Sequence, residues 1–190
     1  MLYDGNKFVY IPFEHIQSFY KDFENENNIQ TPSEIPTFIS RVNQNLTLKN
    51  ILTLAKGIHV EIMVAKNEPL HGVITTIKDD YFVFESPVYK RMYIAQYHLK
   101  WLIPHLNQLP YGLSEKEFQH FASANDETFQ STFVSQLAEL KNQMAILNLG
   151  KDFSHIGKVI NVNNQLISIE NGKSKLTYFN LSHIQTLQLV

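Results

Sequence analysis

The chain has 190 residues, 44% of them hydrophobic and 12% aromatic, so it can bury one large core or two small ones. The 16 Lys and Arg against 18 Asp and Glu give a net charge of −2, which excludes a general positive field that would hold nucleic acid. The absence of cysteine excludes a disulfide framework and a Cys-ligated zinc site. With no apolar run long enough for a signal peptide or a membrane span, we expect a globular cytoplasmic protein without a membrane partner.

The first predicted elements are a strand pair in residues 1–20 and a helical stretch after Thr31. Apolar residues at helical spacing predict one or two helices that end at Gly57, in the position that favours glycine. Alternating apolar residues then predict five strands, the last of which is stopped by Pro104. Together with the helical stretch, these strands make up a first predicted unit at 31–105. Its five strands are expected at 60–64, 70–80, 81–85, 91–95 and 99–103.

Residues 106–125 are predicted to link this unit to a second one at 126–190. Ser114 lies three residues ahead of Glu117, which is capping-box spacing, and apolar residues between 129 and 141 have helical spacing. Five further strands are expected near 144–149, 154–162, 165–170, 175–180 and 184–189. The predicted fold class is therefore mostly β with helical segments (α+β): two tandem five-stranded bent β-barrels, each preceded by helix, plus the N-terminal strand pair.

An internal repeat supports this division. Residues 59–105 overlay 144–190 without a gap at an offset of 85, with seven identities and matching apolar positions between them. A shorter echo overlays residues 7–19 on 175–187, and it is either a remnant or a strand pair that covers an open edge. The seven identities are Lys66/Lys151, Gly72/Gly157, Glu85/Glu170, Lys90/Lys175, Tyr93/Tyr178, His98/His183 and Leu102/Leu187.

Gly72 and Gly157 hold equivalent positions in the long second strand of each unit. A small barrel closes only if one strand bends sharply, and glycine permits the bend without a Cβ clash. We therefore predict that both glycines mark the structural bend.

Three strings of the first unit resemble the first sequence motif of Sm-like proteins, in which a helix leads into a bent five-stranded barrel. They are Gly57-Ile58-His59-Val60-Glu61-Ile62, Leu70-His71-Gly72-Val73-Ile74 and Asp79-Asp80-Tyr81-Phe82-Val83-Phe84-Glu85. Met92-Tyr93-Ile94 with Leu99-Lys100-Trp101-Leu102-Ile103-Pro104 resembles the end of the bacterial member Hfq, and small Bacillus domains of unknown function, some grouped with spore coat proteins. The resemblance covers 58–105 well and 144–190 more loosely.

This resemblance implies rings in which the fourth strand of one barrel pairs with the fifth strand of the next, and RNA bound by loops that face the pore. A chain with two units is expected to pair some of these edges internally. The RNA-binding residues do not carry over, which argues against RNA. Gln96-Tyr97-His98 and Leu181-Ser182-His183 stand where Hfq has Tyr-Lys-His, and Ala95-Gln96 and Asn180-Leu181 replace the Arg-Gly of other members.

His15, His98 and His183 stand at equivalent turns, each before a fifth strand. An imidazole there could bind a metal, stack on a base or sense pH. The favoured interpretation is architectural: each ring bonds a neighbouring backbone group, because a residue repeated in three copies belongs to the unit rather than to one active site.

A second set of candidates pairs aromatic with basic residues on the predicted fourth strands and on the strand that follows. In such a surface the aromatic rings can stack on the bases of single-stranded nucleic acid and the basic groups can neutralise its phosphates. The favoured interpretation is structural: Tyr packs on a barrel face, and Lys protects a strand edge from pairing. Its members are Tyr10, Tyr93, Tyr178, Lys7, Lys90 and Lys175, with Arg91, Lys100 and Trp101 added in the first unit.

Catalytic and cofactor motifs are not found. His59 and His71 could begin a metal site, but the sequence offers no further ligand nearby at a convincing spacing, and Asp79-Asp80 fits a hairpin turn. We therefore expect no metal, no cofactor and no enzymatic activity. The hypothesis is a binding or assembly module that contacts protein partners, including copies of itself, through strand edges, in a spore coat or other bacterial assembly. The alternative is an RNA-binding regulator of the Hfq kind.

Overall fold

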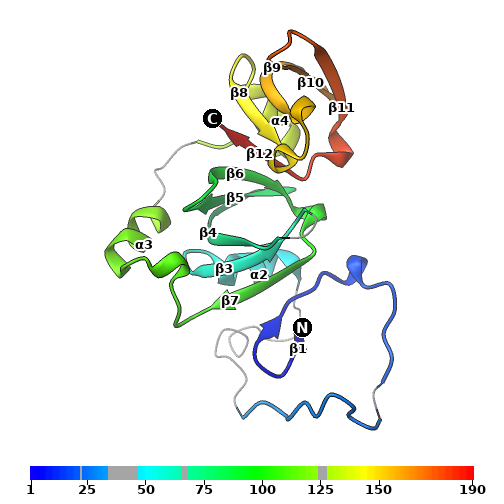
Figure 1. The fold of residues 1–190 in the computed structure, drawn as a ribbon, viewed down its shortest axis with the longest axis vertical. Helices are drawn as coiled ribbons and strands as arrows, with labels where there is room; N and C mark the ends of the chain where they lie inside the picture. The colour runs from blue at the N-terminus through cyan, green and yellow to red at the C-terminus, as the bar shows by residue number, and fades with distance from the viewer. Residues whose placement is uncertain (22, 34–46, 66–67, 124–127) are drawn as a thin grey trace.

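The computed structural model describes residues 1–21, 23–33, 47–65, 68–123 and 128–190. Ten strands form one continuous antiparallel sheet, in the order β11-β10-β9-β8-β12-β6-β5-β4-β3-β7 (Figure 1). Two short strands, β1 (Leu2–Tyr3) and β2 (Phe8–Val9), form a separate N-terminal hairpin. With three helices in the described residues, the protein is mostly β and of the α+β class, as predicted.

The first half of the sheet follows a short helix, α2. Thr47 caps this helix by accepting a hydrogen bond from the backbone N–H of Asn50, and Gly57 follows it with a left-handed φ of 78°, as predicted from the sequence. The rest of the predicted helical stretch, 34–46, lies outside the described residues. The elements are α2 (Leu48–Ala55), β3 (His59–Met63), β4 (Leu70–Ile77), β5 (Tyr81–Ser86), β6 (Lys90–Ala95) and β7 (Trp101–His105).

Strand β7 continues through Pro104, where the sequence predicted that it would stop. Pro104 lies opposite Val60 of β3, and the ladder extends one residue further to His105. A proline is tolerated in a strand where its missing N–H would not face the neighbouring strand. The extension brings His105 beside His59 of β3.

The second half follows α4 and contains five strands close to their predicted places. Asn163 and Asn171 close the two hairpin turns, because each side-chain oxygen accepts hydrogen bonds from two backbone N–H groups that follow it. The elements are α4 (Phe133–Glu139), β8 (Met144–Leu147), β9 (Ile156–Val162), β10 (Leu166–Glu170), β11 (Leu176–Asn180) and β12 (Thr186–Leu189).

Both halves use the same strand order, in which the fifth strand pairs with the first and the rest follow in sequence. Their registers also agree at the offset of 85: one residue is skipped between Ile74 and Thr76 of β4, and one between Val159 and Asn161 of β9. Such a bulge bends the strand that carries it. The bend therefore lies three residues beyond each of the two predicted glycines.

Gly72 and Gly157 stand where two strands approach very closely. A Cβ on Gly72 would lie 2.2 Å from the carbonyl oxygen of Glu85, and a Cβ on Gly157 would lie 2.2 Å from that of Glu170. No real Cβ can occupy such a position, so both sites require glycine for space.

The prediction of two closed barrels is wrong, because the sheet is open. The fourth strand of the first half, β6, pairs with the fifth strand of the second half, β12, so the two halves continue into each other. An edge strand gains a full ladder of backbone hydrogen bonds from such a neighbour. Only β7 and β11 remain as the ends of the ten-stranded sheet.

The segment 106–125, predicted as a linker, contains a helix of the first half. Ser114 and Glu117 form the predicted capping box at the start of α3 (Glu115–Ala122). The helix packs against β4 and β5, so it does not precede the second half as a helical prefix. No helix of the described segments is long and apolar enough to cross a membrane.

Two clusters of buried residues form the hydrophobic cores of the described structure. One lies between α2 and the strands of the first half, and it includes Tyr10 from the N-terminal segment. The other joins Tyr81, Val83 and Tyr93 of the first half to Leu137 and other apolar residues of the second half. The second core therefore depends on both halves of the chain.

Candidate functional site

The junction between the halves is built by β6 and β12, with Tyr93 opposite Leu187. A second contact of the same kind joins the N-terminal segment to β7. There, Tyr10 and Leu102 exchange two backbone hydrogen bonds, each 2.9 Å long. Because Leu102 and Leu187 are equivalent by the offset of 85, and Tyr10 and Tyr93 both precede an equivalent histidine turn, the chain contains two copies of one junction.

Two of the three repeated histidines cross these junctions. His15 places Nε2 at 2.9 Å from the carbonyl oxygen of Tyr97, and His98 places Nε2 at 2.9 Å from that of Ser182. Tyr97 and Ser182 are again equivalent positions. Each imidazole donates to the next histidine turn along the chain rather than to its own turn, and it therefore links two segments that are distant in sequence.

The two surfaces that would form a third junction of this kind are both exposed. Strand β11 carries Tyr178, a residue that is 63% exposed, and in the described part of the chain this strand pairs only with β10. The ring of His183 makes no hydrogen bond to any described residue. Near the other end of the chain, residues 18–21 correspond to β7 and β12, but they run outside any strand in the described structure (Figure 1). Phe19, in this segment, is 82% exposed.

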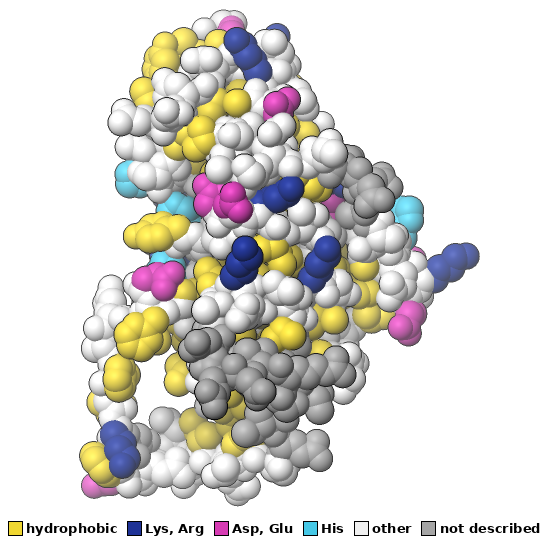
Figure 2. Space-filling view, turned by 180° about the vertical axis from the view of Figure 1, so that it is seen from behind, with side chains coloured by type: hydrophobic (Ala, Val, Ile, Leu, Met, Phe, Trp, Pro, Cys, Tyr) yellow, Lys and Arg dark blue, Asp and Glu magenta, His cyan; other side chains and the backbone are white. Residues whose placement is uncertain are grey.

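The basic candidates are not gathered around this junction. Arg91 is paired with Glu85, with 2.6 Å between Nε and Oε1, and Lys7 is paired with Glu61 at 3.4 Å. Figure 2 shows Lys and Arg side chains scattered over the face that it displays, some of them close to Asp or Glu. The remaining members, Lys90, Lys100, Trp101 and Lys175, belong to different strands or turns of the sheet.

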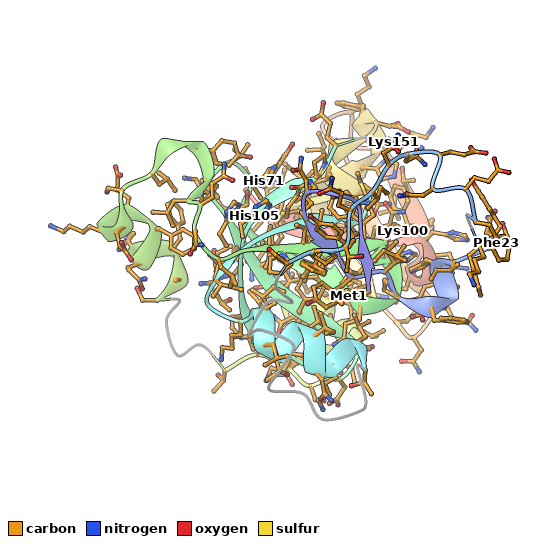
Figure 3. All side chains as sticks on the ribbon, turned by 90° about the horizontal axis from the view of Figure 1, so that it is seen from below. Met1, Phe23, His71, Lys100, His105 and Lys151 are labelled. Carbon is orange, nitrogen blue, oxygen red and sulfur yellow. The ribbon has the colours of Figure 1, made fainter. Side chains whose placement is uncertain are left out.

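Sequence reasoning missed a polar cluster on one face of β3, β4 and β7. Glu61 of β3 lies opposite His71 of β4, and His59 of β3 lies opposite His105 of β7. The ligand atoms of Glu61, His71 and His105 all lie within 4.8 Å of one another. Figure 3 shows His71 and His105 side by side. This arrangement corrects the expectation that His59 and His71 have no further ligand nearby.

The signal that could have found this cluster is the strand order. If the fifth strand pairs with the first, His105 must come next to His59, and Glu61 then shares the same face two residues on. Spacing along the sequence cannot show this, because more than thirty residues separate His71 from His105.

Hydrogen bonds define the proton positions in the cluster. His59 Nδ1 lies 2.7 Å from the carbonyl oxygen of Gln108, so this nitrogen carries the proton. His59 Nε2, 3.4 Å from His71 Nδ1, is then the acceptor. Burial lowers the pKa of His59 to about 4 and also lowers the pKa of His71, so both rings are neutral near pH 7.

Comparison with known proteins gives two matches. Residues 132–187 match the family model described as the YwrJ third domain. Over 197 aligned residues, the chain is 27% identical to Uncharacterized protein YwrJ of Bacillus subtilis (strain 168), with 100% of this chain and 84% of that protein covered. The chain is similar to YwrJ. No solved structure matches it. The matches support a relationship with an uncharacterised Bacillus protein family, and they carry no information on a spore coat or on RNA.

We expect the protein to lose stability as the pH falls below about 6.5. Burial lowers the folded-state pKa of His59, His71 and His98 below their ordinary value of 6.5, so the unfolded chain takes up protons first. Their contribution is complete above that pH and is lost as the pH falls toward the folded values. Urea denaturation in the presence of a chelator should give a free energy of unfolding about 2 kcal/mol lower near pH 5 than near pH 7.5.

His59→Gln should reduce this pH dependence, and His120→Gln, on the exposed surface of α3, should leave it unchanged. Equal free energies of unfolding at the two pH values would contradict the assignment of buried neutral rings.

Proposed function

We propose that the chain is a non-enzymatic assembly module built from Sm-like units, and that copies join by adding residues 18–21 of one molecule to the β11 edge of another. The observation that carries the proposal is the junction itself. It occurs twice within the chain, and both sides of a third copy are exposed.

The internal junctions define the register of the proposed one. Tyr93 pairs with Leu187 and Tyr10 bridges to Leu102. The same offsets place Phe19 of one molecule opposite Tyr178 of the next. Tyr10 and Leu102 exchange both backbone hydrogen bonds, so Phe19 and Tyr178 should do the same.

The histidine link supplies a second, independent correspondence. His15 and His98 each donate to a carbonyl oxygen one residue before the next repeated histidine. By the same rule, the ring of His183 donates to the carbonyl oxygen of Glu14 in the neighbouring molecule. Both elements of the third junction therefore predict the same partner segment, residues 14–21 of a second copy.

The assignment of repeated Sm-like units rests on several features that agree. Each half has the same strand order, a bulge at the same place and a glycine where a Cβ would meet a backbone carbonyl. The match of residues 132–187 to a family model whose description calls it a third domain fits a chain with three copies of the histidine turn. The RNA-binding alternative has no comparable support, because Arg91 and Lys7 already pair with carboxylates.

Association of this kind is heterologous: one surface of the molecule meets a different surface of the next. Such contacts close into a ring if the rotation between copies permits, and otherwise they continue as a filament. In either case the strand edge at β11 is covered, which removes an exposed ladder of backbone groups.

The chain lacks cysteine, so a pair of introduced thiols can test the register. Phe19→Cys and Tyr178→Cys molecules, mixed and oxidised, should form a covalent dimer, because hydrogen-bonded strand partners have Cα atoms about 5.5 Å apart, a distance suited to a disulfide. Neither variant alone should cross-link as fast. Phe23→Cys is the matched control, since Phe23 is as exposed as Phe19 but lies outside the proposed strand.

Sedimentation velocity tests association without labels. The unmodified chain should exceed its monomer mass of 22.1 kDa as concentration rises. Phe19→Pro removes the backbone N–H donor of a residue that is exposed in the monomer, so this variant should remain at that mass, whereas Phe23→Pro should associate normally. A wild-type protein that stays monomeric at every concentration, or cross-linking as efficient with Phe23→Cys as with Phe19→Cys, would rule out this mode of assembly.

A further inference from the structure

We propose that Glu61, His71 and His105 bind a divalent transition-metal ion of the zinc type. Two imidazoles and one carboxylate are a ligand set that such ions accept, with a fourth position left for water or another ligand. The three side chains come from adjacent strands, and their ligand atoms lie within 4.8 Å of one another. This site is separate from the open edge at β11 and does not depend on assembly.

The spacing is close to what a tetrahedral ion requires. Ligand atoms about 2.0 Å from a central zinc are about 3.3 Å apart along each edge of the tetrahedron. His105 Nε2 and Glu61 Oε2 are already 3.1 Å apart. No pair exceeds 4.8 Å, so the longest separation has to shorten by about 1.5 Å, a change within the reach of side-chain torsions.

The surroundings of the site orient its ligands. The hydrogen bond from His59 to Gln108 leaves His59 Nε2 as an acceptor for the Nδ1 proton of His71. The lone pair of His71 then stays on Nε2, which leaves that atom able to bind a metal. The ring of His59 also stacks on His105, with centroids 4.7 Å apart, and Tyr111 packs edge-on against His71. Such outer contacts fix ring orientation in known metal sites.

The fold alone does not require these residues. The histidine turns recur in three copies, but the cluster occurs only in the first half. At the offset of 85, the equivalent residues of the second half are apolar, although the strands pair in the same register there. They are Met144, Ile146, Ile156 and Val190, in place of His59, Glu61, His71 and His105.

A basic side chain already forms an ion pair with Glu61. Lys7 reaches from the N-terminal segment and places its ammonium group 3.4 Å from Glu61 Oε2, the same oxygen that faces His105. A divalent ion would take over this carboxylate and release Lys7. A shallow pocket lined by Lys7, His105, Gln108 and residues 4 and 6 opens beside the cluster and provides a route for the ion.

The test is a titration of the full chain with Co²⁺, followed by visible absorption. Cobalt should bind with one ion per chain and give the intense bands of a four-coordinate site. His71→Ala should weaken binding by at least about a hundredfold, and Glu61→Gln, which keeps the shape of the side chain, by at least about tenfold. His120→Ala is the matched control, because His120 lies on the exposed face of α3 and should leave the affinity unchanged.

Lys7→Ala should change the affinity in the opposite direction. Removing the competing ammonium should tighten cobalt binding by about two- to fivefold, since a partly exposed ion pair is worth little more than this. The proposal is overturned if cobalt gives no four-coordinate bands. It is also overturned if Glu61→Gln binds as well as His120→Ala, or if Lys7→Ala fails to tighten binding. Oligomeric state is not part of this readout, so the result is distinguishable from that of the assembly tests.

Discussion

Replacing Gly72 by Ala should lower the free energy of unfolding by about 3 kcal/mol, at the upper end of the cost of overpacking. The added Cβ would lie 2.2 Å from the carbonyl oxygen of Glu85 and 2.8 Å from Cζ of Phe84. Strand β4 cannot move away, because Gly72 also pairs with Val60 on its other side. The cost arises from lack of space, since Gly72 does not have a left-handed φ.

Gly157→Ala should be destabilising by a similar amount, because its Cβ would lie 2.2 Å from the carbonyl oxygen of Glu170. Gly172→Ala is the matched control: the nearest atom to its Cβ would be Cζ of Phe153 at 3.7 Å, an ordinary contact, and its φ is not left-handed. Urea denaturation of the three variants would measure the free energy of unfolding that each one loses. A loss below about 1 kcal/mol for Gly72→Ala would show that the strands can separate there.

The strands and turns could be predicted from the sequence because their signals are local. Alternating apolar residues place β3 to β6 within a few residues of the prediction, and the capping box at Ser114 gives the start of α3. The glycine that ends α2, Gly57, and the break between the strands expected at 165–170 and 175–180 were found for the same reason. In each case, the residues that produce the structure lie within a few positions of the backbone that they shape.

The open sheet and the histidine–glutamate cluster could not be predicted in this way, because they depend on pairing between distant strands. The sequence of β6 does not by itself reveal that its neighbour is β12, nearly a hundred residues later. Only the resemblance to Sm-like proteins implied that a fourth strand pairs with the fifth strand of the next unit. Similarly, β7 passes through Pro104 to put His105 beside His59, where the local rule for proline predicted an end. The matching positions along the chain do carry some of this long-range information. Once the pairs Tyr93–Leu187 and Tyr10–Leu102 are known, the same correspondence predicts the pair Tyr178–Phe19 between two molecules.

Replacing Tyr81 by Ala should cost about 4 kcal/mol, the usual range for a large buried aromatic residue. The side chain is fully buried, and it packs in the core of the second half although it belongs to the first. Its hydroxyl lies 2.7 Å from the carbonyl oxygen of Gln130 and 3.1 Å from Oε1 of Gln136. Tyr81→Phe should cost only about 1 kcal/mol, the net value of one hydrogen bond.

Because one core includes residues from both halves, we expect the two halves to unfold together. Trp101 is the single tryptophan and lies in β7, at the far end of the sheet from α4. Leu137→Ala, which removes a fully buried side chain of α4, should therefore move the urea midpoint of tryptophan fluorescence as much as that of far-ultraviolet circular dichroism. Tyr81→Ala should behave in the same way. If Leu137→Ala shifts the circular dichroism transition and leaves the fluorescence transition in place, the second half unfolds by itself, and the shared core does not couple them.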